Sequence, residues 1–255
     1  MKIIDILYRR HKVGKKSIAV LIDPDKVQDS QRLKHLIDLC TENCVDFFFV
    51  GGSLITTTNL GEVIAVIKDN VNSVPVILFP GNTLQLDSTA DAILFLSLIS
   101  GRNPDLLIGQ HVQAAPILKN YGMEILPTGY MLISSGRLSS AAYISNTTPI
   151  PDDKISIAAS TAMAGEMLGL KLIYLDGGSG ADKAISFKML SAIRSVISVP
   201  LLVGGGIDNG EKTQAALEAG ADVIVVGNAL ERDPKKLIEI ADRVYEWNLN
   251  LETEK

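Results

Sequence analysis

Residues 172–180 read LIYLDGGSG, a continuous apolar run that ends in a carboxylate and a glycine cluster. Two later stretches repeat this arrangement, because 199–207 reads VPLLVGGGI and 222–228 reads DVIVVGN. Apolar runs without alternation are typical of strands covered on both faces, as in a parallel sheet. Similar runs occur earlier in the chain, at residues 17–23, 46–50, 74–80, 92–97 and 124–128. The sequence therefore predicts eight buried strands.

Segments with helical apolar spacing separate most of these runs. They cover residues 30–44, 183–197, 211–219 and 234–247. Strand and helix alternating eight times in one chain predict an α/β fold, a single (β/α)₈ TIM-barrel domain over residues 1–255. The connection 81–91 is short and poor in helix formers, so we expect its helix, the third, to be missing or reduced. Residues 134–153 are long and polar, and we expect an irregular loop near the active face.

Length and composition are compatible with this fold. The chain has 255 residues, 47% of them hydrophobic and 21% charged. Such a length could form two domains, but α/β barrels reach about 250 residues as one domain. A doubly wound open sheet is the alternative fold, and it would place its glycine fingerprint after the first strand. This chain has Asp23-Pro24-Asp25-Lys26 there, and its late glycine clusters match the phosphate site of barrels near strands seven and eight.

Charge and cysteine content exclude several classes of protein. A formal net charge of −5 disfavours a nucleic-acid binder, which needs basic surface to neutralise phosphates. Cys40 and Cys44 lie in a segment expected to be helical, and we predict reduced, buried thiols rather than a zinc site. No run approaches the roughly 20 apolar residues that span a bilayer, and the amino-terminal apolar stretch is too interrupted for a signal peptide. We therefore expect a cytoplasmic protein without a transmembrane segment.

The three late glycine clusters predict a cup for a phosphate monoester. They are Gly177-Gly178-Ser179-Gly180, Gly204-Gly205-Gly206 and Gly227-Asn228. Consecutive glycines let backbone N–H groups approach an anion closely, and a following helix N-terminus adds partial positive charge. One cluster alone could be a tight turn between strand and helix. Three clusters on successive strand ends converge in a barrel, which favours the phosphate interpretation.

Three polar residues at strand ends are candidates for the chemistry. Asp23 and Ser53 suit a Mg²⁺ site, because Mg²⁺ takes one or two protein oxygens together with substrate phosphate oxygens. The alternatives are an Asx-type turn for Asp23 and an ordinary loop hydroxyl for Ser53. Asp176 could accept hydrogen bonds from the hydroxyls of a polyol phosphate or draw a proton from one, or it could be a helix N-cap. No motif pairs a histidine with a nucleophile, so the histidines are predicted to be structural: His11, His35 and His111.

The ordered set of motifs resembles the geranylgeranylglyceryl phosphate synthase family, whose superfamily includes the heptaprenylglyceryl phosphate synthases. The matching segments are 21–26 (LIDPDK), 51–53 (GGS), 100–111 (SGRNPDLLIGQH), 174–180 (YLDGGSG), 204–207 (GGGI) and 227–228 (GN). The resemblance covers nearly the whole chain. It is closest to the second subgroup of the family, because Asp176 stands where many members have Glu and Leu21 where some have Lys.

This resemblance implies a Mg²⁺-dependent prenyltransferase that joins the 3-hydroxyl of sn-glycerol 1-phosphate to a long-chain prenyl diphosphate. Geranylgeranyl diphosphate is the expected donor, diphosphate leaves, and the product is a precursor of ether phospholipids. Carried over to this chain, Asp23 and Ser53 bind the metal, and Asp176 is catalytic. The residues implied to bind glycerol 1-phosphate are Tyr174, Leu175, Asp176, Gly177, Gly178, Ser179, Gly180, Gly205, Gly206, Gly227 and Asn228. The resemblance also implies a homo-oligomer, a dimer or a hexamer, and the prenyl groove is expected around residues 130–133 and the loop from Ser134.

Two other functions are compatible with a phosphate-binding barrel. A sugar-phosphate isomerase or cyclase would need an acid–base pair at the ends of the first and fifth strands. Asp23 could supply one member, but the fifth strand ends in Pro127-Thr-Gly-Tyr130 and offers no carboxylate. A non-catalytic binder of a phosphorylated metabolite would leave Asp23, Ser53 and Asp176 without a role.

Overall fold

The computed structural model describes residues 1–27, 29–57 and 59–253, and within them eight parallel strands close into one barrel in chain order. The strands are β1 (Ser17–Ile22), β2 (Phe47–Gly52), β3 (Val76–Pro80), β4 (Ala92–Leu98), β5 (Glu124–Leu132), β6 (Leu172–Asp176), β7 (Leu201–Gly204) and β8 (Val223–Val226). Pairing of Ser17 with Val223 and of Val20 with Val226 closes the barrel. The predicted TIM barrel is confirmed.

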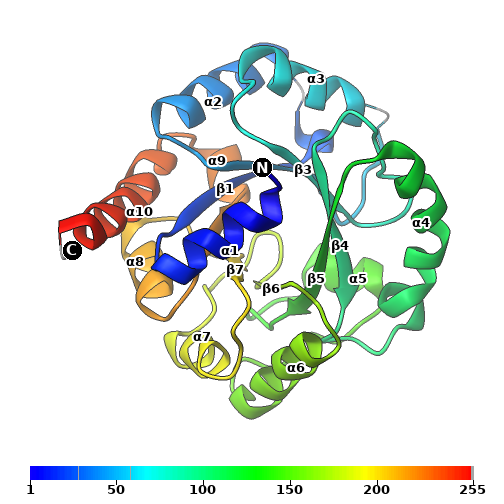
Figure 1. Cartoon of the computed structure of the whole chain (residues 1–255), viewed down its shortest axis with the longest axis vertical. Coiled ribbons are helices and arrows are strands. Elements are labelled where there is room, and N and C mark those ends of the chain that lie inside the picture. The colour runs from blue at the N-terminus through cyan, green and yellow to red at the C-terminus, as the bar shows by residue number, and fades with distance from the viewer. Residues whose placement is uncertain (28, 58, 254–255) are drawn as a thin grey trace.

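Helices form an outer ring around the strands (Figure 1). They are α2 (Ser30–Glu42), α3 (Leu60–Asn70), α4 (Gln110–Tyr121), α6 (Ile155–Met167), α7 (Phe187–Arg194), α8 (Gly210–Glu218) and α10 (Lys236–Thr253). Shorter segments are η1 (Pro24–Lys26), η2 (Asp105–Gly109), α5 (Ser140–Ser145) and α9 (Asn228–Arg232). Residues 81–91 all belong to the described part of the chain and contain no helix, as the sequence predicted.

Burial on both faces explains why the strands lack alternation. On β2, Phe47 and Phe49 belong to the apolar cluster inside the barrel. Phe48 and Val50 belong to the second cluster, which contains the inner residues of the surrounding helices. Every position of such a strand is therefore apolar, as expected for a parallel sheet with helices outside it.

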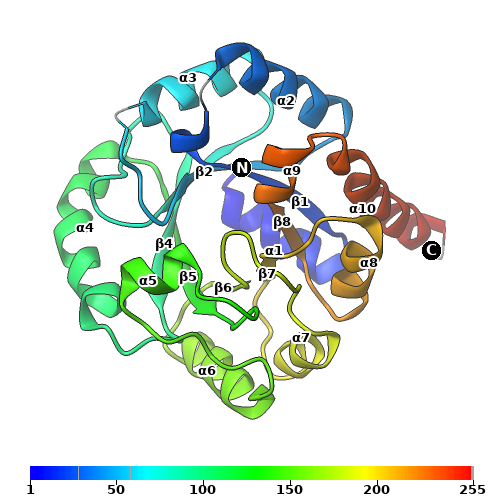
Figure 2. The same cartoon turned by 180° about the vertical axis from the view of Figure 1, so that it is seen from behind.

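A helix that the sequence analysis did not predict closes one end of the barrel. In α1 (Ile3–Val13), Ile3 and Leu7 are buried in the cluster inside the barrel. The Glu124 carboxylate accepts hydrogen bonds from the N–H groups of Ile3 at 2.6 Å and Ile4 at 2.8 Å, which holds the beginning of α1 against β5. Figure 1 looks onto this end, and Figure 2 looks onto the opposite end, where the strands terminate.

Some predicted boundaries and environments are wrong. Helix α2 ends at Glu42, and Cys44 is exposed with a φ of 52°. Both thiols are free, as expected, but only Cys40 is buried, and burial raises its pKa to about 12. The stretch 134–153 is not wholly irregular either, because it contains α5 and pairs Ile150 with Ile133.

Candidate functional site

Two pockets meet at the end of the barrel where the strands terminate. The polar pocket has a volume of about 770 Å³ and lies over the ends of β6, β7, β8 and β1. The apolar pocket has a volume of about 330 Å³ and lies against β3, β4 and α4. Both pockets share lining residues: Gly52, Ser53, Phe79, Tyr130 and Ile144. A ligand with a polar head and an apolar tail could therefore occupy both at once.

Most of the predicted site residues line the polar pocket. They are Asp23, Ser53, Tyr174, Asp176, Gly178, Ser179, Gly180, Gly205, Gly206, Gly227 and Asn228. Leu175 and Gly177 do not line it. The Leu175 side chain is buried in the cluster between strands and helices, and the Gly177 N–H donates to the Gly204 carbonyl at 3.1 Å. Neither residue presents a side chain to the pocket.

The backbone of the glycine cup requires glycine. Gly205 has a φ of +81°, and a Cβ there would lie 2.5 Å from the Gly177 nitrogen and 2.8 Å from Asp176 Oδ1. Gly206, with a φ of +75°, would place a Cβ 2.6 Å from the carbonyl oxygen of Lys183. Any other residue would strain the backbone and clash with the end of β6 or with the segment that follows it.

The helix N-termini contribute less to the cup than expected. Helix α9 begins directly at Asn228, in the third glycine cluster. Helices α7 and α8 begin only at Phe187 and Gly210, several residues beyond their clusters. The cup thus depends mainly on the N–H groups and turns of the glycines themselves.

Asp176 is a buried carboxylate that lines the polar pocket beside Tyr130, which both pockets share. Its Oδ2 accepts a hydrogen bond from the Tyr130 hydroxyl at 2.6 Å, and its Oδ1 accepts one from the Gly178 N–H at 2.7 Å. Burial raises the pKa of Asp176, and these two hydrogen bonds lower it only in part. Since α7 begins at Phe187, Asp176 is not a helix N-cap. The group is therefore a carboxylate that is held in place and has increased basicity.

Tyr130 is the partner of Asp176, a role that the sequence analysis did not predict. Its ring packs edge-on against Phe79 and Tyr174, with centroid distances of 5.8 and 5.4 Å. Burial raises the pKa of Tyr130 well above its ordinary value, so its hydroxyl stays protonated and donates to Asp176. The register of β5 against β6 brings the two residues together. No local motif signals this contact, because it joins residues far apart in the sequence.

Asp23 lines the polar pocket at the end of β1, next to the third glycine cluster at the end of β8, and is half-buried. Its Oδ1 accepts from the Asp25 N–H at 3.1 Å, so the Asx-type turn that we considered is present. Burial raises the pKa of Asp23, against the opposing charge of Lys26, whose Nζ lies 3.5 Å from Oδ2. Ser53 follows Gly52, where a Cβ would lie 3.3 Å from the Asp23 carboxyl carbon. The two predicted metal ligands thus belong to neighbouring strand ends.

This pair of oxygens fits a metal that keeps other ligands. Among the described residues, no cluster of three His, Cys, Asp or Glu side chains could hold an ion by itself. Mg²⁺ retains several waters and shares phosphate oxygens with its substrate, so one carboxylate and one hydroxyl suit it.

Basic side chains outside the glycine motifs surround the cup. Lys26 Nζ lies 2.9 Å from Glu231 Oε1 and 3.4 Å from Asn228 Oδ1, which places an ammonium group between Asp23 and the third cluster. Arg232 also lines the pocket. Leu21 stands where some members of the resembling family have Lys and carries no charge. Lys26 and Arg232, which follow it in the sequence, supply positive charge to the pocket instead.

The loop that carries Ser53 is fixed by Asp25. The Asp25 carboxylate accepts hydrogen bonds from the N–H and hydroxyl groups of both Thr56 and Thr57, at 2.7–3.0 Å. Although its slight burial opposes the effect, the bonds from Thr57 and Thr56 lower the pKa of Asp25 to about 2.

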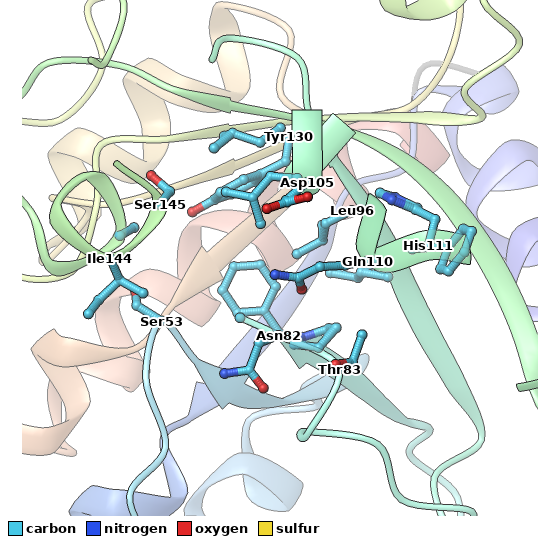
Figure 3. Close-up of a pocket in the computed structure, with 18 of the residues that line it drawn as sticks. Ser53, Asn82, Thr83, Leu96, Asp105, Gln110, His111, Tyr130, Ile144 and Ser145 are labelled. Carbon is cyan, nitrogen blue, oxygen red and sulfur yellow. The ribbon is translucent and has the colours of Figure 1, made fainter. Parts of the chain in front are cut away.

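The apolar pocket lies where the helix between β3 and β4 is missing. Residues from both faces of β4 line it, Leu94 from the inner cluster and Ile93 from the outer one. Ala114 of α4 lines it as well, and Figure 3 shows Gln110 and His111 of α4 on one side and Ile144 of α5 on the other. Within the expected groove, Tyr130 and Leu132 line this pocket, but Met131 and Ile133 do not.

His111 lies on the wall of this pocket. Its Nε2 is 3.2 Å from the Ser97 hydroxyl, and its ring packs edge-on against Phe95 at 4.5 Å. In the described structure its Nδ1 has no hydrogen-bond partner, and burial lowers the pKa of the imidazole. His11 lies at the other end of the barrel, 2.9 Å from Asp222, and His35 is exposed on α2.

Proteins with similar sequences and structures include several geranylgeranylglyceryl phosphate synthases. The PcrB family model matches residues 11–244. The geranylgeranylglyceryl phosphate synthase of Spirosoma linguale is 57% identical over 235 residues, which cover 92% of this chain and 94% of that protein. The synthase of Pyrococcus horikoshii is 40% identical over 239 residues, 93% of this chain and 92% of that protein. A crystal structure of (S)-3-O-geranylgeranylglyceryl phosphate synthase from Thermoplasma acidophilum in complex with sn-glycerol-1-phosphate aligns with a TM-score of 0.89 at 30% identity. This alignment covers 96% of the present chain and 99% of the Thermoplasma acidophilum chain.

Proposed function

The chain belongs to the PcrB family and to the geranylgeranylglyceryl phosphate synthase family that its motifs predicted, and from this premise we propose that it is a prenyltransferase that alkylates sn-glycerol 1-phosphate. The 3-hydroxyl of sn-glycerol 1-phosphate joins a long-chain prenyl diphosphate, diphosphate leaves, and an ether-lipid precursor forms. The observation that carries this proposal is the meeting of a polar and an apolar pocket at Tyr130, beside the buried Asp176. We expect glycerol 1-phosphate in the polar pocket and the prenyl chain in the apolar pocket.

The glycine cup suits the phosphate group of glycerol 1-phosphate. Backbone N–H groups of the glycines can donate to phosphate oxygens, and the Ser179 hydroxyl donates to Asn228 Oδ1 at 3.0 Å. Lys26 adds charge at the rim of the cup. Because the Asp176 carboxylate would repel the phosphate, it orients the ligand so that a hydroxyl faces it instead.

Magnesium is the cofactor that we propose, with geranylgeranyl diphosphate as the donor. The Asp23 carboxylate and the Ser53 hydroxyl would hold the ion, and water and diphosphate oxygens would supply its remaining ligands. A bound Mg²⁺ would neutralise charge on the departing diphosphate.

Residues of the chain account for the remaining chemistry. The bond between the allylic carbon and the diphosphate oxygen breaks, and a bond forms from that carbon to the 3-hydroxyl oxygen. Asp176 accepts the hydroxyl proton, while the Tyr130 hydroxyl keeps the carboxylate aimed at the substrate. The face of the Tyr130 ring is suited to stabilising positive charge on the allylic carbon. Holding both substrates in register contributes up to roughly 7–11 kcal/mol.

A direct assay tests this function. The protein is incubated with Mg²⁺, radiolabelled sn-glycerol 1-phosphate and a series of prenyl diphosphates, and butanol-extractable product is counted. We expect product with the wild type and a loss of about a hundredfold or more in kcat/KM for glycerol 1-phosphate in Asp176→Asn. Binding of prenyl diphosphate should change less. No product with any prenyl length would refute the proposal, and omitting the metal tests the Mg²⁺ requirement separately.

A further inference from the structure

Large apolar side chains are exposed around the mouth of the two pockets. We call this set the mouth rim; it consists of Leu54, Leu84, Leu138, Tyr143 and Ile144. Leu84 is 90% exposed, Tyr143 74% and Leu138 67%. Single exposed apolar residues are ordinary on protein surfaces, but several around one opening indicate an interaction site.

All five residues lie at the same end of the barrel. Leu54 follows β2, Leu84 follows β3, and the other three lie in the connection after β5. In a parallel barrel these connections leave the carboxyl ends of the strands, opposite the end that α1 closes. Figure 2 looks onto this end, where α5, which carries Tyr143 and Ile144, stands in front of the strands.

The mouth rim is continuous with the expected path of the prenyl chain. Ile144 lines both pockets, and Leu54, Leu138 and Tyr143 line the polar one. Leu84 directly follows Thr83, which lines the apolar pocket. Any partner seated on the rim therefore covers the opening through which substrate and product pass. A folded protein would close that opening, whereas a lipid layer is itself a place where a prenyl chain resides.

We propose that the mouth rim docks on a lipid bilayer, so that the prenyl chain passes from the acyl layer into the apolar pocket and the product returns the same way. This proposal rests on the proposed prenyltransferase function. A prenyl chain that crossed water would expose its apolar surface at a cost in free energy, and a docked rim removes that step. Shallow insertion of leucine and tyrosine side chains is the usual basis of such interfacial binding.

Apolar contact rather than charge drives the docking that we propose. The chain has a net charge of −5, which opposes attraction to anionic lipids. Arg137, which directly precedes Leu138 of the rim, is itself paired with Asp182 at 3.6 Å. Binding should therefore occur on zwitterionic vesicles and change little with salt.

Vesicle binding tests the proposal without any substrate. The full-length protein is sedimented with phosphatidylcholine vesicles, and the partition coefficient is measured for the wild type, Leu84→Asp and Leu84→Asp/Leu138→Asp. The matched control is Leu168→Asp, because Leu168 is 79% exposed but lies between α6 and β6, at the α1 end of the barrel. We expect the partition coefficient to fall about tenfold in Leu84→Asp, further in the double variant, and negligibly in the control.

Several outcomes would overturn the proposal. One is that the wild-type protein stays in the supernatant. Another is that the partition coefficient falls as much in Leu168→Asp as in Leu84→Asp. A third is that the wild type self-associates and that Leu84→Asp abolishes this self-association. The last result would mean that a second copy of the chain covers the rim. Turnover separates this proposal from the proposed function: Leu84→Asp should match the wild type with geranyl diphosphate in solution and be slower with vesicle-borne geranylgeranyl diphosphate. A wild type inactive with both donors would refute the prenyltransferase function, whatever its vesicle binding.

Discussion

Replacing Tyr130 by Phe removes one hydroxyl group and keeps the ring, so it isolates the hydrogen bond to Asp176. The bond is 2.6 Å long and lies between two buried groups. A hydrogen bond to a charged group contributes roughly 1.5–3 kcal/mol, and this one stabilises the ionised carboxylate. Since about 1.36 kcal/mol corresponds to one pKa unit, Tyr130→Phe should raise the pKa of Asp176 by about one to two units beyond the effect of burial. The bond from the Gly178 N–H remains.

This shift predicts a change in the pH dependence of catalysis. Asp176 accepts a proton only when it is ionised, so activity falls as the pH drops through its pKa. The titratable side chains that face it are Tyr130 and Tyr174, and burial keeps both of their pKa values well above the ordinary range. Both phenols therefore stay protonated at neutral pH. The acidic limb of kcat/KM for glycerol 1-phosphate should move up by about one to two pH units in Tyr130→Phe.

The assay measures initial rates at saturating prenyl diphosphate and Mg²⁺ from about pH 5 to about pH 9. Tyr174→Phe is the matched control, because it removes a neighbouring phenol that does not bond to Asp176. Its acidic limb should stay at the wild-type position, even if its KM changes. An acidic limb that does not move in Tyr130→Phe, with wild-type activity at its plateau, would refute the assignment of Asp176 as the base.

Three further changes test other parts of the structure. Asp23→Ala should lower turnover by at least about tenfold and leave the far-ultraviolet circular dichroism unchanged; near-normal turnover would contradict a metal role. Gly205→Ala should strain the backbone and push against Asp176. Urea denaturation should show that the free energy of unfolding falls by about 1–3 kcal/mol, and calorimetry should show that glycerol 1-phosphate no longer binds. Burial raises the pKa of Asp222, but the contact with His11 helps to lower it below the ordinary value. The ionised Asp222 therefore stabilises the fold at pH values above its unfolded pKa of about 3.9. This stabilisation is lost as the pH falls through the lower pKa of the folded state. Urea denaturation at falling pH should therefore show a smaller acid loss in Asp222→Asn than in the wild type, and equal losses would contradict the argument.

The parts of the fold that the sequence predicted are those with a local signal. A strand covered on both faces must be apolar at every position, which is why 172–176 and its counterparts were recognised. The glycine cup was recognised for a similar reason, because positions such as Gly205 exclude every side chain. Helix α1 has a weaker signal, since only Ile3 and Leu7 are buried in a segment with several basic residues.

The contacts that complete the site have no local signal. Tyr130 meets Asp176 because β5 and β6 pair in one register, and a shift by one residue would turn the tyrosine to the other face. Lys26 reaches Glu231 only because the barrel closes between β1 and β8. Such contacts depend on the closed geometry of the barrel. The sequence could therefore identify Asp176 as a candidate but not the hydrogen bond from Tyr130 that lowers its pKa.

The missing helix between β3 and β4 was a sequence signal that could have predicted the apolar pocket. In a parallel barrel, the outer face of each strand needs a cover. Residues 81–91 supply no helix, yet Ile93 on the outer face of β4 is apolar, so some other apolar group has to cover that face. In the structure it borders the apolar pocket, with Ala114 of α4 on the opposing side. Because Ile93 is only 2% exposed, other side chains of the protein already cover this face, and the missing helix explains why an apolar pocket lies directly beside it.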